Sequence, residues 1–114
     1  MLPRQMRLTK SRDFSRIYRR NRTVASAHLR LLYSSADQNL SRFGFVVSKK
    51  QAARIVDRNR LKRILRSTIR AHMAHLRGGY DIIIQARPGV GRAAAKQVRK
   101  ELEALLDKAK LLKI

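Results

Sequence analysis

The middle of this chain interleaves basic and apolar residues at a spacing that favours one kind of regular structure. Residues 48–66 contain eight Lys or Arg and a single acid, Asp57. Residues suited to a core recur three and four positions apart, which is the spacing of one face of an α-helix. They are Leu61, Ile64, Leu65, Thr68, Ile69, His72, Met73 and Leu76. The pattern predicts a helix over about residues 55–76, stopped by the glycines at 78–79.

The side of this helix that faces away from the apolar residues is a basic ridge. At helical spacing the ridge comprises Arg58, Lys62, Arg66 and Arg70, with Asn59, Arg60 and Arg63 beside them. Like charges four apart destabilise a helix by roughly 0.2–0.5 kcal/mol per pair, and Asp57 alone can offset little of this. The ridge therefore indicates a polyanionic partner, because guanidinium and ammonium groups suit phosphate oxygens. A charged face that is merely solvated is the alternative.

The charge of the whole chain supports a nucleic-acid partner. The 114 residues carry a net charge of +21 and are 44% hydrophobic, so one modest core can form despite the repulsion. Residues 1–77 have 20 basic and 3 acidic side chains, whereas residues 78–114 have 8 and 4. We expect the partner to lie against the first two thirds and its affinity to fall with salt. A ribosomal or other structural RNA-binding protein and a DNA-binding architectural protein remain alternatives.

Other function classes lack the residues that they require. The chain has no cysteine, which excludes disulfides and thiolate metal sites. No apolar run approaches the ~20 residues that span a bilayer, and the first residues lack the apolar segment of a signal peptide. The seven acids form no paired motif, and His72 and His75 have no third ligand nearby. We therefore expect a cytoplasmic protein with no membrane partner, no bound metal and no catalytic site of its own.

The remaining periodicities predict three strands and two further helices. The strands are expected at residues 29–33, 43–47 and 80–86, the last of them buried and central, with a hairpin turn at residues 37–39. The further helices are expected at about residues 11–20, capped by Ser11, and at about residues 92–111. This order predicts an α+β fold in a single RNA-binding domain over residues 1–114, with helices packed against a small mixed sheet.

Two aromatic residues in the first predicted helix stand among arginines. Phe14 and Tyr18 are four apart and are interleaved with Arg12, Arg16 and Arg19. Aromatic rings beside guanidinium groups are typical of proteins that stack unpaired bases. On spacing alone, the alternative that both rings belong to the core stays open.

Two longer motifs resemble the bacterial ribonuclease P protein subunit. The first is RFGFVVSKK over residues 42–50, and the second is IVDRNRLKRILR over residues 55–66. Asp13-Phe14 with Tyr18, and residues 81–87, extend the resemblance over nearly the whole chain. The chain departs from the family at Ile55, where Ala is usual, and at Ser67, where Glu or Gln is usual.

The resemblance implies a protein subunit of a ribozyme. The RNA subunit, acting with Mg²⁺, carries the endonuclease activity that removes the 5′ leader from precursor tRNA. The protein binds that RNA and the leader, and it needs no cofactor and no protein partner. The implied fold is that of the second domain of ribosomal protein S5, with a left-handed βαβ crossover. The general rule would predict a right-handed crossover in ~98% of cases.

The resemblance also implies roles for particular residues. Those that would dock on the catalytic RNA are Arg58, Asn59, Arg60, Lys62, Arg63 and Arg66, and Arg70 continues their line. Those that would hold the single-stranded leader in a cleft are Phe14, Tyr18, Tyr33, Ser48, Lys49 and Arg87, with Arg12 as a neighbouring cation.

Overall fold

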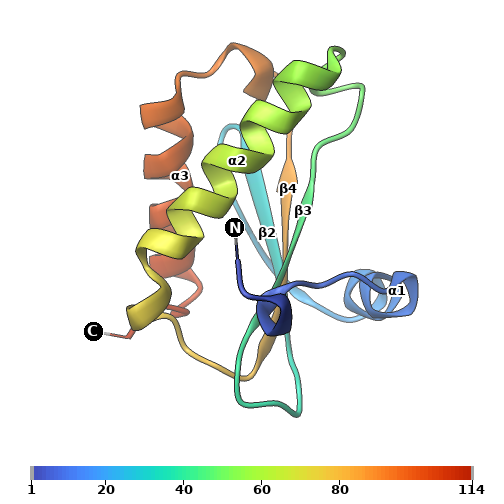
Figure 1. Cartoon of the computed structure of the whole chain (residues 1–114), viewed down its shortest axis with the longest axis vertical. Coiled ribbons are helices and arrows are strands. Elements are labelled where there is room, and N and C mark those ends of the chain that lie inside the picture. Colours follow the sequence, from blue (N-terminus) through green and yellow to red (C-terminus); the bar gives the residue numbers. More distant parts are fainter. Residues whose placement is uncertain (1, 114) are drawn as a thin grey trace.

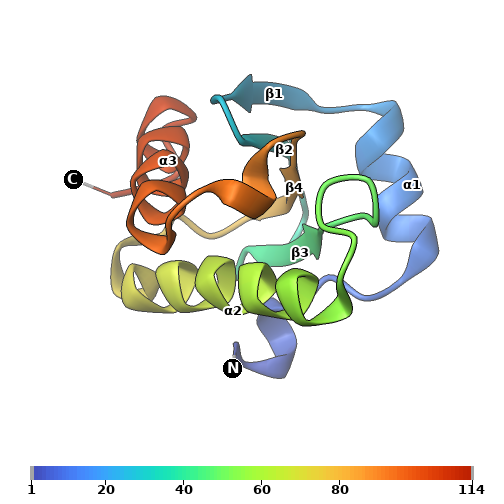
Figure 2. The same ribbon diagram turned by 90° about the horizontal axis from the view of Figure 1, so that it is seen from above.

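A four-stranded sheet separates one short helix from two longer ones in the computed structural model, which describes residues 2–113 (Figures 1 and 2). The strands are β1 (Arg22–Ala25), β2 (Leu29–Ser35), β3 (Arg42–Val46) and β4 (Tyr80–Ala86). The helices are α1 (Ser11–Arg19), α2 (Ile55–Ala71) and α3 (Ala95–Lys108). Three short 3-10 turns are η1 (Arg4–Met6), η2 (Met73–His75) and η3 (Val90–Arg92). The predicted α+β architecture is confirmed.

The strand order across the sheet is β1-β2-β4-β3. The pairs β1–β2 and β2–β4 are antiparallel, whereas β3 and β4 are parallel. As predicted, β4 is central and buried, with Ile82, Ile83 and Ile84 wholly inaccessible. Helix α2 joins β3 to β4, and this crossover is left-handed when its path is followed through Figures 1 and 2. The family resemblance implied this handedness, against the general rule.

The predicted hairpin at residues 37–39 is wrong, because β4 lies between the two strands that it would have joined. The hairpin in this fold is instead formed by β1 and β2, and the Ser26 N–H donates to the Leu29 carbonyl at 2.8 Å in its turn. Strand β1 was not predicted, because Val24 is the one residue of its four that is even partly buried. An edge strand of this kind leaves no apolar run in the sequence.

The helix ends differ from the predicted ones by a few residues. Helix α1 begins at Ser11, but Lys10 occupies the N-cap position and no side chain caps the helix. Helix α2 ends at Ala71 and gives way to η2, which covers the last residues of the predicted helix. Helix α3 begins at Ala95, because η3 takes up the preceding segment.

Each face of the sheet has its own core, because side chains alternate along a strand. The larger core lies between the sheet and helices α2 and α3. Its buried members include Leu29, Leu31, Phe43, Ile82, Ile84, Leu61, Leu65, Ile69, Leu102 and Leu106. The smaller core lies under α1 and consists of Leu8, Ile17, Leu32 and Ile83, with Phe14 and Val46 packed against it. Only the first of these faces is covered by two helices.

Candidate nucleic-acid interface

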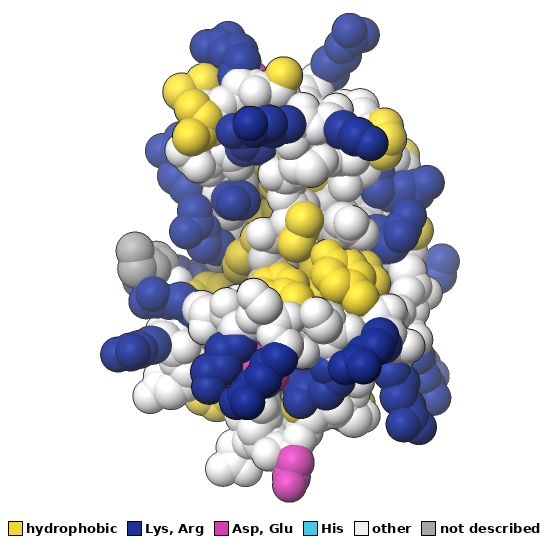
Figure 3. All heavy atoms as spheres, turned by 90° about the vertical axis from the view of Figure 1, so that its right-hand side faces the viewer, with side chains coloured by type: hydrophobic (Ala, Val, Ile, Leu, Met, Phe, Trp, Pro, Cys, Tyr) yellow, Lys and Arg dark blue, Asp and Glu magenta, His cyan; other side chains and the backbone are white. Residues whose placement is uncertain are grey.

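Part of the sheet face beside α1 is uncovered. Arg30 lies opposite Gln85, which lies opposite Val46, and alternation puts all three on the face of Leu32 and Ile83. Arg30 is exposed, and Gln85 and Val46 are half-buried. We call Arg30, Gln85 and Val46 the open row. Figure 3 shows this side of the molecule, where an apolar recess crosses the middle between groups of Lys and Arg side chains.

The two aromatic residues of α1 have different surroundings. The Phe14 ring lies against Gly44, where a Cβ would be 2.5 Å from the ring, so a larger residue at this position would displace the ring. Tyr18 is 45% exposed. Burial raises the pKa of the Tyr18 hydroxyl, and the nearby positive charge of Arg30 opposes that shift. Phe14 therefore belongs partly to the smaller core, while Tyr18 borders the open row.

A buried carboxylate fixes α1 to the sheet. Asp81 is fully inaccessible, and its oxygens accept from Arg42 Nε at 2.9 Å and from Arg16 Nη2 at 2.5 Å. Gln38 Nε2 donates to the same carboxylate at 3.1 Å, and Asp13 lies 3.5 Å from Arg42. The hydrogen bond that Arg42 donates to Asp81 raises the pKa of Arg42 above its usual value. Sequence reasoning missed this cluster, although an acid within the apolar run of β4 was a signal for it.

The prediction that Tyr33 shares a cleft with Phe14 and Tyr18 is wrong. Tyr33 packs against the larger core on the opposite face, and its ring centroid lies 6.2 Å from that of Tyr80. Leu32 is the β2 residue that faces α1. Since side chains alternate along a strand, an error of one residue moves a side chain to the other face of the sheet.

The other residues of the predicted leader cleft lie just beyond the ends of β3 and β4 or on α1. Ser48 and Lys49 are exposed just beyond β3, and the Ser48 hydroxyl donates to Gln51. Arg87 follows β4, and its guanidinium donates to the Ser26 carbonyl. Because β3 and β4 are parallel, these residues follow the two strands at the same edge of the sheet, next to the open row. Arg12 is exposed on the first turn of α1.

The ridge residues of α2 fall into two groups that differ in solvent exposure. Asn59, Arg60, Arg63 and Arg70 are exposed, whereas Arg58, Lys62 and Arg66 are half-buried. Arg58 donates to the carbonyls of Ala52 and Ala53 at 3.0 and 2.9 Å. Asp57 lies 3.9 Å from Arg54, outside the ridge. Within residues 2–113, no carboxylate lies within 4.0 Å of any ridge cation.

A family model for ribonuclease P matches residues 2–110. The chain belongs to the ribonuclease P protein family. It is 36% identical over 101 residues to the ribonuclease P protein component of Thioalkalivibrio sulfidiphilus, covering 89% of this chain and 83% of that one. It is also similar to the solved ribonuclease P protein of Staphylococcus aureus, with a TM-score of 0.87, 31% identity, and coverage of 95% and 98%. The Thermotoga maritima ribonuclease P protein gives a TM-score of 0.81 at 28% identity, with coverage of 90% and 96%.

Membership of the ribonuclease P protein family connects the surface described above to an RNA partner. In the part of the chain that the structure describes, no group of three or more His, Asp or Glu side chains is arranged to hold a metal ion. Among the same residues, no helix has both the length and the apolar character needed to cross a membrane.

Proposed function

We propose that this chain is the protein subunit of a ribonuclease P whose RNA subunit removes the 5′ leader from precursor tRNA. Family membership supports the enzyme. The observation that carries the role of this chain is the ridge of six α2 cations with no carboxylate within reach among residues 2–113. A fold keeps so many unneutralised charges on one helix at a cost, and a phosphate backbone would offset that cost.

The ridge is the proposed docking surface for the RNA subunit. Arg60, Arg63 and Arg70 reach into solvent, where each can engage a phosphate by two parallel hydrogen bonds. Arg58 is held by the carbonyls that precede α2, which fixes the direction of its guanidinium. Such contacts position an RNA without reading its sequence.

The open row is the proposed path of the single-stranded leader. Tyr18 offers an exposed ring at one side, and Arg30 offers a cation at the β2 end of the row. Lys49 and Arg87 follow β3 and β4 at the sheet edge next to the row. Stacking of unpaired bases on aromatic rings beside a cationic track is the usual way to hold a strand with little sequence preference.

The chemistry is assigned to the RNA subunit and its Mg²⁺ ions. The protein would contribute affinity, because its cations reduce the repulsion between the phosphates of the RNA subunit and those of precursor tRNA. We therefore expect the isolated chain to be inactive and its effect to be greatest at low salt.

Reconstitution with the RNA subunit tests this proposal. Adding the wild-type chain should allow cleavage of precursor tRNA at a salt concentration at which the RNA subunit alone is inactive. The double variant Arg60→Gln/Arg63→Gln should raise the protein concentration needed for half-maximal cleavage. A matched double variant on α3, Arg99→Gln/Lys100→Gln, removes equal charge outside the ridge and should have a smaller effect. Unchanged cleavage on adding the wild-type chain would contradict the proposal.

The proposed leader path has its own test. Tyr18→Ala should weaken the binding of precursor tRNA to the holoenzyme by roughly 1 kcal/mol, the low end of the range for one lost stack. The binding of mature tRNA should barely change, because it has no leader. Tyr33→Ala, on the other face of the sheet, should not discriminate between the two substrates. An equal loss for both substrates in Tyr18→Ala would remove Tyr18 from the path.

A further inference from the structure

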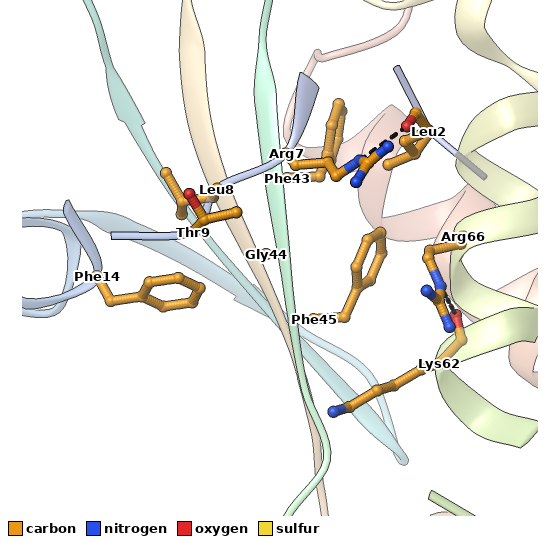
Figure 4. A pocket seen from close by; sticks show the side chains of 10 residues that line it. All are labelled: Leu2, Arg7, Leu8, Thr9, Phe14, Phe43, Gly44, Phe45, Lys62 and Arg66. Atoms are coloured by element: carbon orange, nitrogen blue, oxygen red, sulfur yellow. Dashed lines mark hydrogen bonds between the residues drawn. The ribbon is translucent and has the colours of Figure 1, made fainter. Parts of the chain in front are cut away.

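A hollow of about 260 Å³ lies along the outer edge of β3, between the N-terminal residues 2–9, α1 and α2 (Figure 4). Its apolar lining consists of Leu2, Leu8, Phe14, Phe43, Gly44 and Phe45. Its polar lining consists of Arg7, Thr9, Lys62 and Arg66. Three cations and no acid line this hollow, so its charge favours an anionic ligand with an apolar or aromatic part.

Two rings flank the hollow on either side of β3. Figure 4 shows Phe14 on one side of the strand and Phe45 on the other, with Gly44 between them. Both rings are half-buried, so each keeps an accessible surface. Because Gly44 has no side chain, Phe14 lies close against the strand. A planar ring entering the hollow would meet the exposed surface of Phe45.

The backbone of β3 adds polar groups to this edge. The Leu8 N–H donates to the Phe43 carbonyl at 2.9 Å, so Phe43 directs its backbone groups away from β4. Phe45, two residues further on, directs its N–H and C=O to the same edge. Within residues 2–113, no backbone hydrogen bond from the N-terminal residues continues to Phe45. The outer edge of β3 therefore offers the Phe45 N–H as a donor and the Phe45 C=O as an acceptor beside the Phe45 ring.

Two ridge cations, Lys62 and Arg66, line the hollow, and Arg66 also borders Asn59 and Arg63 on the surface of α2. Lys62 and Arg66 are half-buried, and Arg66 Nε donates to the Lys62 carbonyl at 3.3 Å, which turns the guanidinium back along the helix. In Figure 4 the Lys62 side chain extends past the Phe45 ring. Arg63, one residue from Lys62, does not line the hollow and is exposed.

We propose that this hollow binds one unpaired nucleotide of the RNA subunit. The base lies against Phe45 with its edge toward the Phe45 backbone, and the phosphate lies between Lys62 and Arg66. The volume of about 260 Å³ is near the lower limit of the ~300–1,000 Å³ of small-molecule sites, so it suits one base and not several. The site rests on the proposed function, and it adds a base-binding contact to a ridge that otherwise holds phosphates alone.

The RNA subunit is the source of the nucleotide because of where the hollow lies. Lys62 and Arg66 are ridge residues, and the ridge is the proposed surface for that RNA. The open row, the proposed leader path, is on the sheet face beside α1, whereas Phe45 packs against the larger core on the other face. A leader in the open row would have to pass around β3 to reach Phe45.

Base-specific chemical probing of the RNA subunit, with protein and without precursor tRNA, tests the proposal. Wild-type protein should protect one unpaired base, and Phe45→Leu should leave that base reactive while lowering affinity about five- to tenfold, the size expected for one lost stack. Tyr33→Leu is the matched control, because Tyr33 is also a half-buried ring packed on the larger core but lies outside the hollow. It should keep the base protected.

A second pair of variants keeps the test decisive if Phe45→Leu does not fold. Lys62→Gln and Arg63→Gln each remove one ridge charge, and both should weaken RNA binding to a similar degree. Only Lys62→Gln should also expose the protected base. The same reactivity pattern in both variants would overturn the site.

The outcomes separate this site from the proposed function. A wild-type chain that does not bind the RNA subunit overturns both. A chain that binds it but leaves every unpaired base reactive overturns the site alone. Protection that appears only in the leader of added precursor tRNA also overturns it, because the hollow would then serve the substrate and not the RNA subunit.

Discussion

Helices α1 and α2 are both rich in arginine, but they differ in whether a carboxylate lies within reach of those arginines. On α1, Arg16 reaches buried Asp81 at 2.5 Å, and Arg42 of the sheet shares that acid. On α2, the acid Asp57 lies beside Arg54 and leaves the ridge without a partner among residues 2–113. The first set of cations joins one element to another, and the second remains available to a ligand. Charge density in the sequence does not distinguish these roles, whereas the position of an acid does.

The largest expected effect comes from removing Asp81, the buried acid of β4 that pairs with Arg16 of α1. Asp81→Asn should lower the free energy of unfolding by about 3 kcal/mol, because Arg42 would keep its charge without its partner. This is the low end of the range for such losses, since the side chains of Arg42 and Arg16 are 26% and 53% exposed. Urea unfolding measures the loss. A change below about 1 kcal/mol would mean that Asp81 does not fix α1.

A second structural acid, Glu101 of α3, should make stability depend on pH. Its carboxylate accepts hydrogen bonds from Ser26, His28 and Gln97, which lower the pKa of Glu101 to about 2 against the effect of burial. The folded-state pKa is below the unfolded one, so this stabilisation is complete above about pH 4.5 and is lost as the pH falls toward 2. The free energy of unfolding should drop by up to roughly 3 kcal/mol across that window.

Glu101→Gln is the control for this dependence. It should flatten the curve of unfolding free energy against pH between about 4.5 and 2. A variant curve as steep as the wild-type curve would assign the acid sensitivity to other carboxylates.

The unpartnered ridge should respond to simple anions. Sulfate or phosphate at low ionic strength should raise the stability by about 1 kcal/mol and the melting temperature by about 4–8 °C, by binding the folded form and relieving repulsion. The triple variant Arg60→Gln/Arg63→Gln/Arg70→Gln should be more stable without anions and gain less from them. If calorimetry shows the same gain for both proteins, the repulsion lies elsewhere.

The smallest expected effect concerns Asp57, the single acid at the start of α2. Its distance from Arg54 is 3.9 Å, and both side chains are exposed, so Asp57→Asn should change the stability by less than about 0.5 kcal/mol. The same variant should bind the RNA subunit slightly more tightly, because it removes a negative charge beside the ridge. A stability loss like that of Asp81→Asn would erase the distinction between the two helices.

Sequence reasoning succeeded where a pattern was long and failed where one residue decided the geometry. The periodicity of α2 and the apolar run of β4 identified both elements, because many residues repeat the same signal. Strand β1 has four residues and one that is partly buried, so it left no pattern to read. Tyr33 was placed in the cleft by the family resemblance, although its alternation with Leu31 and Leu29 indicates the face of the larger core.

The candidate site was predicted in part for similar reasons. The ridge follows from helical spacing, which depends on residues close together in the sequence. The open row and the hollow bring together residues from separate elements, such as Arg30 with Gln85 and Phe45 with Lys62. The role of Asp81 depends on Arg16 and Arg42, which are 65 and 39 positions away. Contacts of this range follow from the strand order, which local patterns do not contain.

The unneutralised cations of α2 also bear on the supply of this protein in the cell. A ligand that binds only the folded form stabilises it by mass action, and protein without its ligand is unfolded more often and degraded sooner. We therefore expect chains made in excess of the RNA to have shorter lifetimes than assembled ones. The unneutralised cations of α2 would then match the amount of the protein to the amount of its RNA without a dedicated regulator.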